Sequence, residues 1–148
     1  MSRDLALLVL RLSGLGLAVL HGWGKVVALS NGQGQRFIDA VAAMGFPAPG
    51  LFAWVAALAE FGCGLLVVLG LGTRLAASAA AFTMLVAAFG RHKAHLHAAA
   101  ALGLSPASEE SLKSWGNPEL ALVYLVAMLT LSLTGGGRFA LDARLGRR

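Results

Sequence analysis

Residues 10–25 read LRLSGLGLAVLHGWGK, and this stretch decides the fold. It lies inside an apolar run that extends from about Leu5 to Leu29. About 20 apolar residues in a helix cross a hydrocarbon core about 30 Å thick, so we expect a membrane-spanning helix here. Arg11, His21 and Lys25 interrupt the run. Because an arginine or lysine at the centre of such a helix costs about 2.5–3.5 kcal/mol, these side chains require a polar environment.

The ionisable residues of this span share one face of the expected helix with a ladder of small residues. At about 100° per residue, Arg11, His21 and Lys25 fall within an arc of about 100°. Small residues allow the backbone of a neighbouring helix to approach closely. We therefore expect this face to point into a helical bundle and away from lipid. The small residues on the face are Gly14, Ala18 and Gly22.

The composition indicates a membrane protein. Of the 148 residues, 57 % are hydrophobic and only 13 % are charged, whereas a soluble domain carries about 25 % charged residues. The chain is short enough to form one domain over residues 1–148. The net charge of +5 does not indicate nucleic-acid binding, because the basic residues lie between and beyond the apolar stretches. The expected partner of the apolar surface is a lipid bilayer.

Three further apolar stretches complete an expected all-α, four-helix integral membrane bundle. The second span covers about residues 51–71, the third about 75–90 and the fourth about 118–134. Short interfacial helices are expected in the two outer loops. One covers residues 35–44, where apolar residues recur at helical spacing. The other is expected after Ser105-Pro106, which has the form of an N-cap followed by a proline at the first helical position.

The basic residues predict the orientation of the chain. Four spans place both termini on the same side of the membrane, together with the basic tail of residues 138–148. The positive-inside rule then predicts that both termini are cytoplasmic. Six basic residues are expected on the side of the termini and four on the opposite side. The six are Arg3, Arg74, Arg138, Arg144, Arg147 and Arg148, and the four are Arg36, Arg91, Lys93 and Lys113.

The second span contains a single acidic residue, Glu60, with the small residue Gly64 on the same face. Counted at 1.5 Å per residue from the outer surface, Glu60 and His21 lie at similar depths of about 12–13 Å. We therefore expect Glu60 to pair with His21, with Arg11 or with both. Two interpretations remain open for these residues, a structural ion-pair network and a quinone or proton site.

Three other polar residues are expected in the outer third of the membrane. Lys25 fits an interfacial lysine whose ammonium group reaches toward water, with a role as a headgroup ligand as the alternative. Glu119 fits an acidic residue favoured by the dipole in the first turn of the fourth helix. Tyr124 lies just beyond it.

Three histidines, His92, His95 and His97, lie in the sequence RHKAHLH. His92 and His95 share a helix face if the third helix continues past residue 91, and such a pair is able to bind a transition metal. No cysteine or carboxylate at ligand spacing completes a site, so we expect a solvated interfacial cluster. No covalent cofactor is expected, because the chain shows no flavin or haem motif.

Several stretches resemble, in order, the DoxX-like membrane proteins. They are the opening run of residues 10–25, MGFP at 44–47, E-x3-G-x5-G-x2-TR at 60–74, the start of the fourth span at 119–124, and GGGRFALD at 135–142. The resemblance implies a four-helix bundle in the bacterial cytoplasmic membrane. It also implies association with redox assemblies, because the family name comes from a subunit of an archaeal thiosulfate:quinone oxidoreductase, and other members are linked to oxidative-stress defence. The polar segment around residues 105–115 is longer than the family pattern.

The first functional hypothesis is therefore a redox-linked membrane subunit that binds quinone between the first two helices. Arg11 and His21 would hydrogen-bond a quinone oxygen, and Glu60 would set the protonation of the histidine. The alternatives are a non-catalytic scaffold or chaperone for partner proteins and a component of small-solute or metal transport. The resemblance leaves open whether the chain is an enzyme. Small residues of the third span, Ala77 and Ala81, are compatible with a homodimer.

Overall fold

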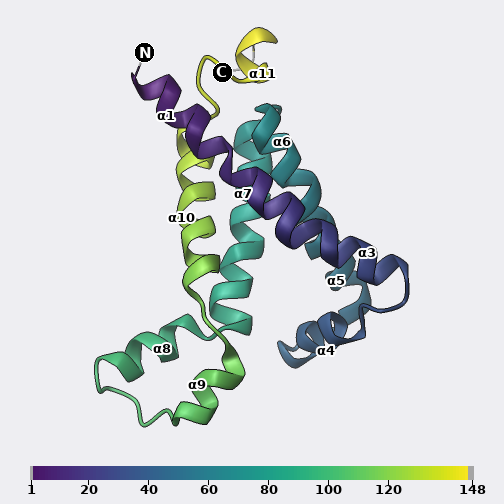
Figure 1. The fold of residues 1–148 in the computed structure, drawn as a ribbon, viewed down its shortest axis with the longest axis vertical. Coiled ribbons are helices and arrows are strands. Elements are labelled where there is room, and N and C mark those ends of the chain that lie inside the picture. Colours follow the sequence, from purple (N-terminus) through teal and green to yellow (C-terminus); the bar gives the residue numbers. More distant parts are fainter. Residues whose placement is uncertain (1, 147–148) are drawn as a thin grey trace.

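A computed structural model describes residues 2–146, and every regular element in that range is helical (Figure 1). The first long helix, from Ser2 to Ser30, comprises α1 (Ser2–Arg11), α2 (Ser13–Leu15), the π-helical η1 (Gly16–Trp23) and α3 (Gly24–Ser30). The second comprises α5 (Pro49–Leu58), η2 (Ala59–Cys63) and α6 (Gly64–Leu69). The third comprises α7 (Thr73–Leu85) and η3 (Val86–Arg91), and the fourth is α10 (Glu119–Thr134).

The predicted all-α membrane fold is confirmed. The first three long helices are each long and apolar enough to cross a membrane. α10 has 16 residues and reaches the required length only together with α9 (Glu109–Trp115), from which it is bent by 48°. The shorter elements are α4 (Gln35–Ala43), α8 (Ala94–Ala101) and α11 (Leu141–Arg144).

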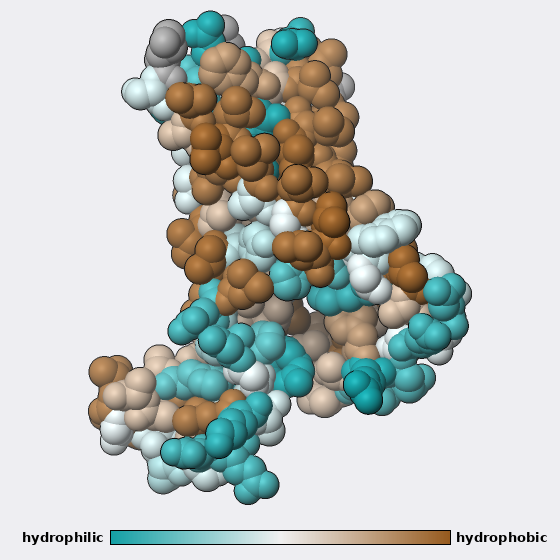
Figure 2. Space-filling model, viewed as in Figure 1, coloured by the Kyte–Doolittle hydropathy of each residue, from teal (hydrophilic) through white to brown (hydrophobic). Residues whose placement is uncertain are grey.

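The surface shows where lipid would contact the bundle. Hydrophobic side chains cover most of the face in Figure 2, and hydrophilic ones gather mainly around the loops. Leucines and valines on the outside of all four long helices are exposed, Leu20, Leu75 and Leu133 among the most. Such an apolar exterior is unfavourable in water and favourable in a bilayer.

The two ends of the bundle differ. Both termini lie at one end, beside α6 and α11, and we call it the terminal end (Figure 1). The opposite end carries α4 on one side and α8 with α9 on the other, and we call it the loop end. Arg147 and Arg148 of the predicted basic tail lie outside the described residues.

Small residues set the spacing of the helices. A Cβ atom at Gly14 would lie 2.6 Å from the carbonyl oxygen of Gly64, and one at Gly64 would lie 2.8 Å from the carbonyl oxygen of Gly14. A Cβ atom at Gly22 would overlap the backbone of Phe61. The first and second helices therefore touch backbone to backbone, which only glycine at these positions allows.

α7 and α10 lie side by side (Figure 1). The alanine-rich face of α7 packs with Leu125, Met128 and Leu131 of α10 in the main core. Ala77 and Ala81 belong to this core and are almost completely buried. They therefore do not form a surface through which two copies of the chain would pair.

The second outer loop differs from the prediction. Lys93 has a positive φ of 51°, so the third helix ends at Arg91 and α8 begins separately at Ala94. The next helix is not capped by Ser105. Its N-cap is Ser108, whose hydroxyl oxygen accepts a hydrogen bond from the Ser111 amide at 3.2 Å. The Ser105-Pro106 signal is thus three residues early, because a second serine is better placed beside Glu109 and Glu110 in the first turn.

Candidate functional site: a pocket beside a buried ion pair

A buried ion pair joins the first and second helices. The Lys25 ammonium group lies 2.6 Å from Oε1 and 2.7 Å from Oε2 of Glu60, and it donates to both oxygens. The Glu60 side chain is only 3 % exposed, whereas the Lys25 side chain is 31 % exposed. Phe37 of α4 covers the ammonium group, with its ring centroid 4.8 Å away. This arrangement desolvates the carboxylate and leaves the lysine at the edge of a cavity.

That cavity, which we call the loop-end pocket, has a volume of about 380 Å³. It lies between α4, the start of the second helix and the end of the third, and its lining includes both members of the ion pair. Figure 2 shows the surface hollowed between the lobe of α4 and the lobe of α8 and α9. Most of the wall is apolar, and its large side chains are Phe37, Met44, Phe46, Phe52, Phe82 and Val86.

Arg91, the last residue of the third helix, and His92, the residue after it, also line the pocket. Nη1 of Arg91 donates to the carbonyl oxygens of Ser114 and Trp115, at 3.4 and 3.3 Å. Nδ1 of His92 lies 2.8 Å from the carbonyl oxygen of Trp115. These bonds attach the end of α9 to the pocket wall, so the longer second loop is part of the site's surroundings.

Each of the three helices that bear the pocket turns π-helical nearby. Glu60 lies within η2, Lys25 follows η1 by two residues, and Val86 and Arg91 belong to η3. π-helical turns are rare and occur frequently at functional sites, because the wider turn displaces side chains from their α-helical positions. Because all three π-helical turns lie near residues of the loop-end pocket, we take this pocket as the candidate site.

Arg11 lies elsewhere, and its expected pairing with Glu60 is wrong. Its side chain is 2 % exposed and is directed to the terminal end. Nε donates to the carbonyl oxygen of Val67 at 3.0 Å, Nη2 donates to that of Val68, and Nη1 donates to that of Gly136 at 3.4 Å. The first two carbonyls belong to the last turn of α6, where the helix dipole is negative. The Val67 carbonyl oxygen also accepts from the Gly70 amide at 3.1 Å. The arginine therefore caps the second helix.

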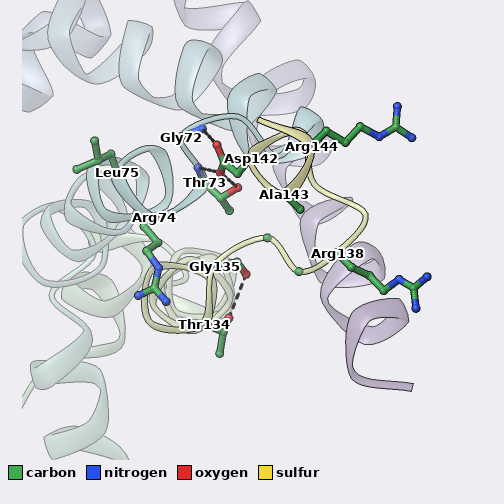
Figure 3. Close-up of a pocket in the computed structure, with 12 residues that line it drawn as sticks. Gly72, Thr73, Arg74, Leu75, Thr134, Gly135, Arg138, Asp142, Ala143 and Arg144 are labelled. Carbon is green, nitrogen blue, oxygen red and sulfur yellow. Dashed lines mark hydrogen bonds between the residues drawn. The ribbon is translucent and has the colours of Figure 1, made fainter. Parts of the chain in front are cut away.

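The acidic residue of GGGRFALD caps the next helix. The Asp142 carboxylate accepts hydrogen bonds from the amides of Gly72 and Thr73, at 2.7 and 2.8 Å, and from the Thr73 hydroxyl at 2.8 Å (Figure 3). Its own amide donates to the carbonyl oxygen of Gly70 at 2.9 Å. Arg11 and Asp142 together hold the tight turn between the second and third helices against the C-terminal segment.

His21 also lies apart from Glu60. Its ring meets that of Tyr124 edge-on, with centroids 5.7 Å apart, so it faces the fourth helix. Glu119 is exposed at the start of α10. Its amide donates to Oδ1 of Asn117 at 2.8 Å, and Nδ2 of Asn117 donates to its carboxylate at 3.1 Å. The structure thus brings Lys25 together with Glu60, and His21 together with Tyr124. Glu119 contacts neither pair and bonds Asn117 at the start of α10.

The three loop histidines do not converge. His92 bonds the Trp115 carbonyl, the His95 ring stacks on Phe89 with centroids 6.2 Å apart, and His97 meets the Trp115 ring edge-on at 5.9 Å. His92 and His95 do not share a continuous helix, because the third helix ends before them. Within residues 2–146, no group of three or more His, Cys, Asp or Glu side chains is placed to hold a metal ion.

The aromatic wall of the pocket was not predicted from the sequence. The sequence signal for it was the amphipathic pattern of residues 35–44, which placed Phe37, Ile38, Val41 and Met44 on one side of a helix. All of them except Ile38 line the pocket. The MGFP stretch contributes Phe46, whose ring packs at 4.7 Å from that of Phe52. The apolar face of the helix in the first outer loop was thus the feature of the sequence that could have indicated the pocket.

Comparison with known proteins identifies one family. The family model described as DoxX matches residues 6–93 of the chain. The matched range contains both members of the ion pair and every residue that lines the loop-end pocket. No curated protein and no solved structure matches the chain.

Proposed function

Because this chain belongs to the DoxX family of membrane proteins, we propose that it is a redox-linked membrane subunit whose loop-end pocket binds a quinone-type ligand. The observation that carries the proposal is the Lys25–Glu60 ion pair, which borders an otherwise apolar and aromatic cavity at one end of the bundle. Ligand pockets combine such an apolar wall with a few placed polar groups.

The residues of the pocket fit a quinone headgroup. The volume of about 380 Å³ lies within the usual range of small-molecule sites, about 300–1,000 Å³. Phe46 and Phe52 offer ring faces and edges to a flat ring. The ammonium group of Lys25 supplies a charged donor for a carbonyl oxygen. An isoprenoid tail would leave the pocket along the lipid-facing side chains of the second and third helices.

A bound quinone would supply two-electron, two-proton redox chemistry, and the chain would supply the polar groups around it. Lys25 is already fixed by two hydrogen bonds to Glu60, so its remaining N–H is oriented without a large entropic cost. Glu60 holds a negative charge away from water and is the group best placed to exchange a proton with the lysine. His92 and Arg91 occupy the wall near the loops. Electrons would come from a partner oxidoreductase.

Glu60→Gln is expected to lower the amount of quinone that co-purifies from bacterial membranes by at least about tenfold, since the lost charge is worth more than about 1.4 kcal/mol of binding. Glutamine keeps the shape of the side chain but no longer orients the ammonium group of Lys25. The measurement is mass spectrometry of the lipid extract of the purified protein. Glu109→Gln, which neutralises an exposed carboxylate, is the matched control and should leave the quinone content unchanged.

The scaffold hypothesis gives a different result in the same experiment. If wild-type protein, purified in a mild detergent, carries no quinone and both variants behave alike, the ion pair serves only to hold the first two helices together. Equal quinone content in wild type and Glu60→Gln would also contradict the proposed site. Transport is a weaker alternative, because the wall of the loop-end pocket is mostly apolar.

We also propose that the protein lies in the bacterial inner membrane with both termini in the cytoplasm. The support is the excess of basic residues in the segments on the side of the two termini, six against four at the loop end. The six are Arg3, Arg74, Arg138, Arg144, Arg147 and Arg148, and the four are Arg36, Arg91, Lys93 and Lys113. In a Cys63→Ala background, Ser108→Cys should react with a membrane-impermeant maleimide in intact cells after outer-membrane permeabilisation, and Ser2→Cys should not. The reverse labelling pattern would overturn the orientation.

A further inference from the structure

A second pocket lies at the terminal end, well separated in the fold from the Lys25–Glu60 pair. Its volume is about 740 Å³. The walls are the first turn of α7, the loop of residues 134–138 and α11 (Figure 3). The turn that forms one wall is held by the Asp142 carboxylate, so this pocket is built on the same hydrogen bonds that fix the C-terminal segment.

The rim of this terminal-end pocket is strongly basic. Arg74 lies on one side of the opening, and Arg138 and Arg144 extend outward from the other (Figure 3). Among the described residues, no ion pair within 4.0 Å joins any of these arginines to a carboxylate. The one acidic residue in the lining, Asp142, already accepts three hydrogen bonds from Gly72 and Thr73. Three exposed guanidinium groups therefore surround the opening, and the nearby carboxylates already accept backbone hydrogen bonds, Asp142 as above and Asp4 from the Arg138 amide at 3.0 Å.

The same rim is also apolar. Leu75 lines the pocket and is 81 % exposed. Leu133 at the end of α10 and Phe139 next to Arg138 are exposed as well, and the Arg138 guanidinium lies 5.3 Å from the Phe139 ring centroid. Exposed leucine and phenylalanine beside unpaired arginines are typical of a surface at the level of lipid headgroups, where acyl chains and phosphates meet.

We propose that the terminal-end pocket binds the headgroup of an anionic glycerophospholipid. The arginines recognise the phosphate, because a guanidinium group matches its oxygens with two parallel hydrogen bonds. Arg138 and Arg144 extend outward, so they would change rotamer to reach a phosphate at the opening. The acyl chains lie along Leu75 and Leu133. A soluble phosphate compound has no apolar part that would cover these two exposed leucines. This proposal does not depend on the proposed quinone site.

The test is native mass spectrometry of the detergent-solubilised protein titrated with phosphatidylglycerol or with phosphatidylcholine. Wild-type protein should retain phosphatidylglycerol in preference to phosphatidylcholine. Arg138→Gln/Arg144→Gln should weaken phosphatidylglycerol binding at least about tenfold, because each basic residue near an anionic headgroup contributes appreciably. The control Arg36→Gln/Lys113→Gln removes the same charge at the loop end, from two exposed residues, and should bind like wild type.

Three results would overturn the proposal. Equal binding of the two lipids would show that the arginines do not select an anionic headgroup. An equal loss in the loop-end control would show a general effect of surface charge. Tight binding of inorganic phosphate alone, at affinity equal to that of phosphatidylglycerol, would identify the pocket as a site for soluble phosphate.

Discussion

Lys25→Met is expected to lower the free energy of unfolding by about 3 kcal/mol, the largest effect of any single substitution at the loop-end pocket. Breaking one side of a buried ion pair costs about 3–5 kcal/mol because the other charge stays buried without a partner. Glu60 is 3 % exposed and has no other hydrogen bond within the described residues. Lys25 is partly exposed, which places the expected loss at the lower end of that range. Unfolding in mixed micelles, followed by circular dichroism, measures it.

A double variant separates stability from function at this site. In Lys25→Met/Glu60→Leu both charges are removed together, and apolar residues of similar volume replace them. Replacing a buried ion pair in this way is often neutral or stabilising. The double variant should therefore recover most of the stability that Lys25→Met loses. A double variant as unstable as the single one would show that the pair contributes net stability, and would favour a purely structural role.

Arg11→Leu is expected to destabilise the protein by at least about 2 kcal/mol through a different mechanism. The guanidinium group satisfies the carbonyl oxygens of Val67, Val68 and Gly136. A buried acceptor left without a partner costs about 1–3 kcal/mol. Here the carbonyl oxygens of Val68 and Gly136 lose their donor, whereas that of Val67 keeps the Gly70 amide. Arg36→Leu, at an exposed position of α4, is the control and should change the free energy of unfolding by less than about 0.5 kcal/mol.

Arg11→Leu also distinguishes the role of Arg11 from that of Lys25. Arg11 belongs to the terminal end, so Arg11→Leu protein that remains folded should still bind a quinone in the loop-end pocket. Loss of binding in folded Arg11→Leu protein, with normal far-UV circular dichroism, would place Arg11 in the ligand site as the sequence alone suggested. Normal stability of the variant would contradict the capping role.

The long helices follow directly from the sequence because length and apolarity decide them. Gly14, Gly22 and Gly64 stand at the contact between the first and second helices, where the ladder of small residues suggested a close approach. The start of α10 also follows a local rule, since Asn117 accepts from the Glu119 amide two residues later. In each case the structure depends on residues close together in the chain or on one helix face.

The polar partners do not follow from local rules. The face of the first helix was drawn with α-helical spacing, but residues 16–23 form a π-helix, in which successive side chains turn by a smaller angle. His21 therefore faces Tyr124, and Lys25 reaches Glu60. A buried arginine suggested a carboxylate partner, whereas the fold supplies three carbonyl oxygens from α6 and from a loop 125 residues away. Such partners are set by tertiary packing.

The loop-end pocket could not be predicted for a similar reason. Its wall combines a loop helix, α4, with residues of the second and third helices, and no periodic pattern reports which faces meet. The attachment of α9 through Arg91 and His92 is equally a tertiary feature. The family pattern pointed to the right segments, because MGFP and Glu60 both reach this pocket, but it did not show that they share one cavity.

The most direct test of the proposed function is the equilibrium binding of a short-chain quinone to purified protein in nanodiscs, wild type beside Lys25→Met/Glu60→Leu. The double variant is the right comparison because we expect it to keep the fold while it removes the Lys25–Glu60 ion pair. We expect saturable binding to wild type and an affinity at least about tenfold lower in the double variant. Equal binding by the two proteins, or none by wild type, would contradict a quinone site at the Lys25–Glu60 pair.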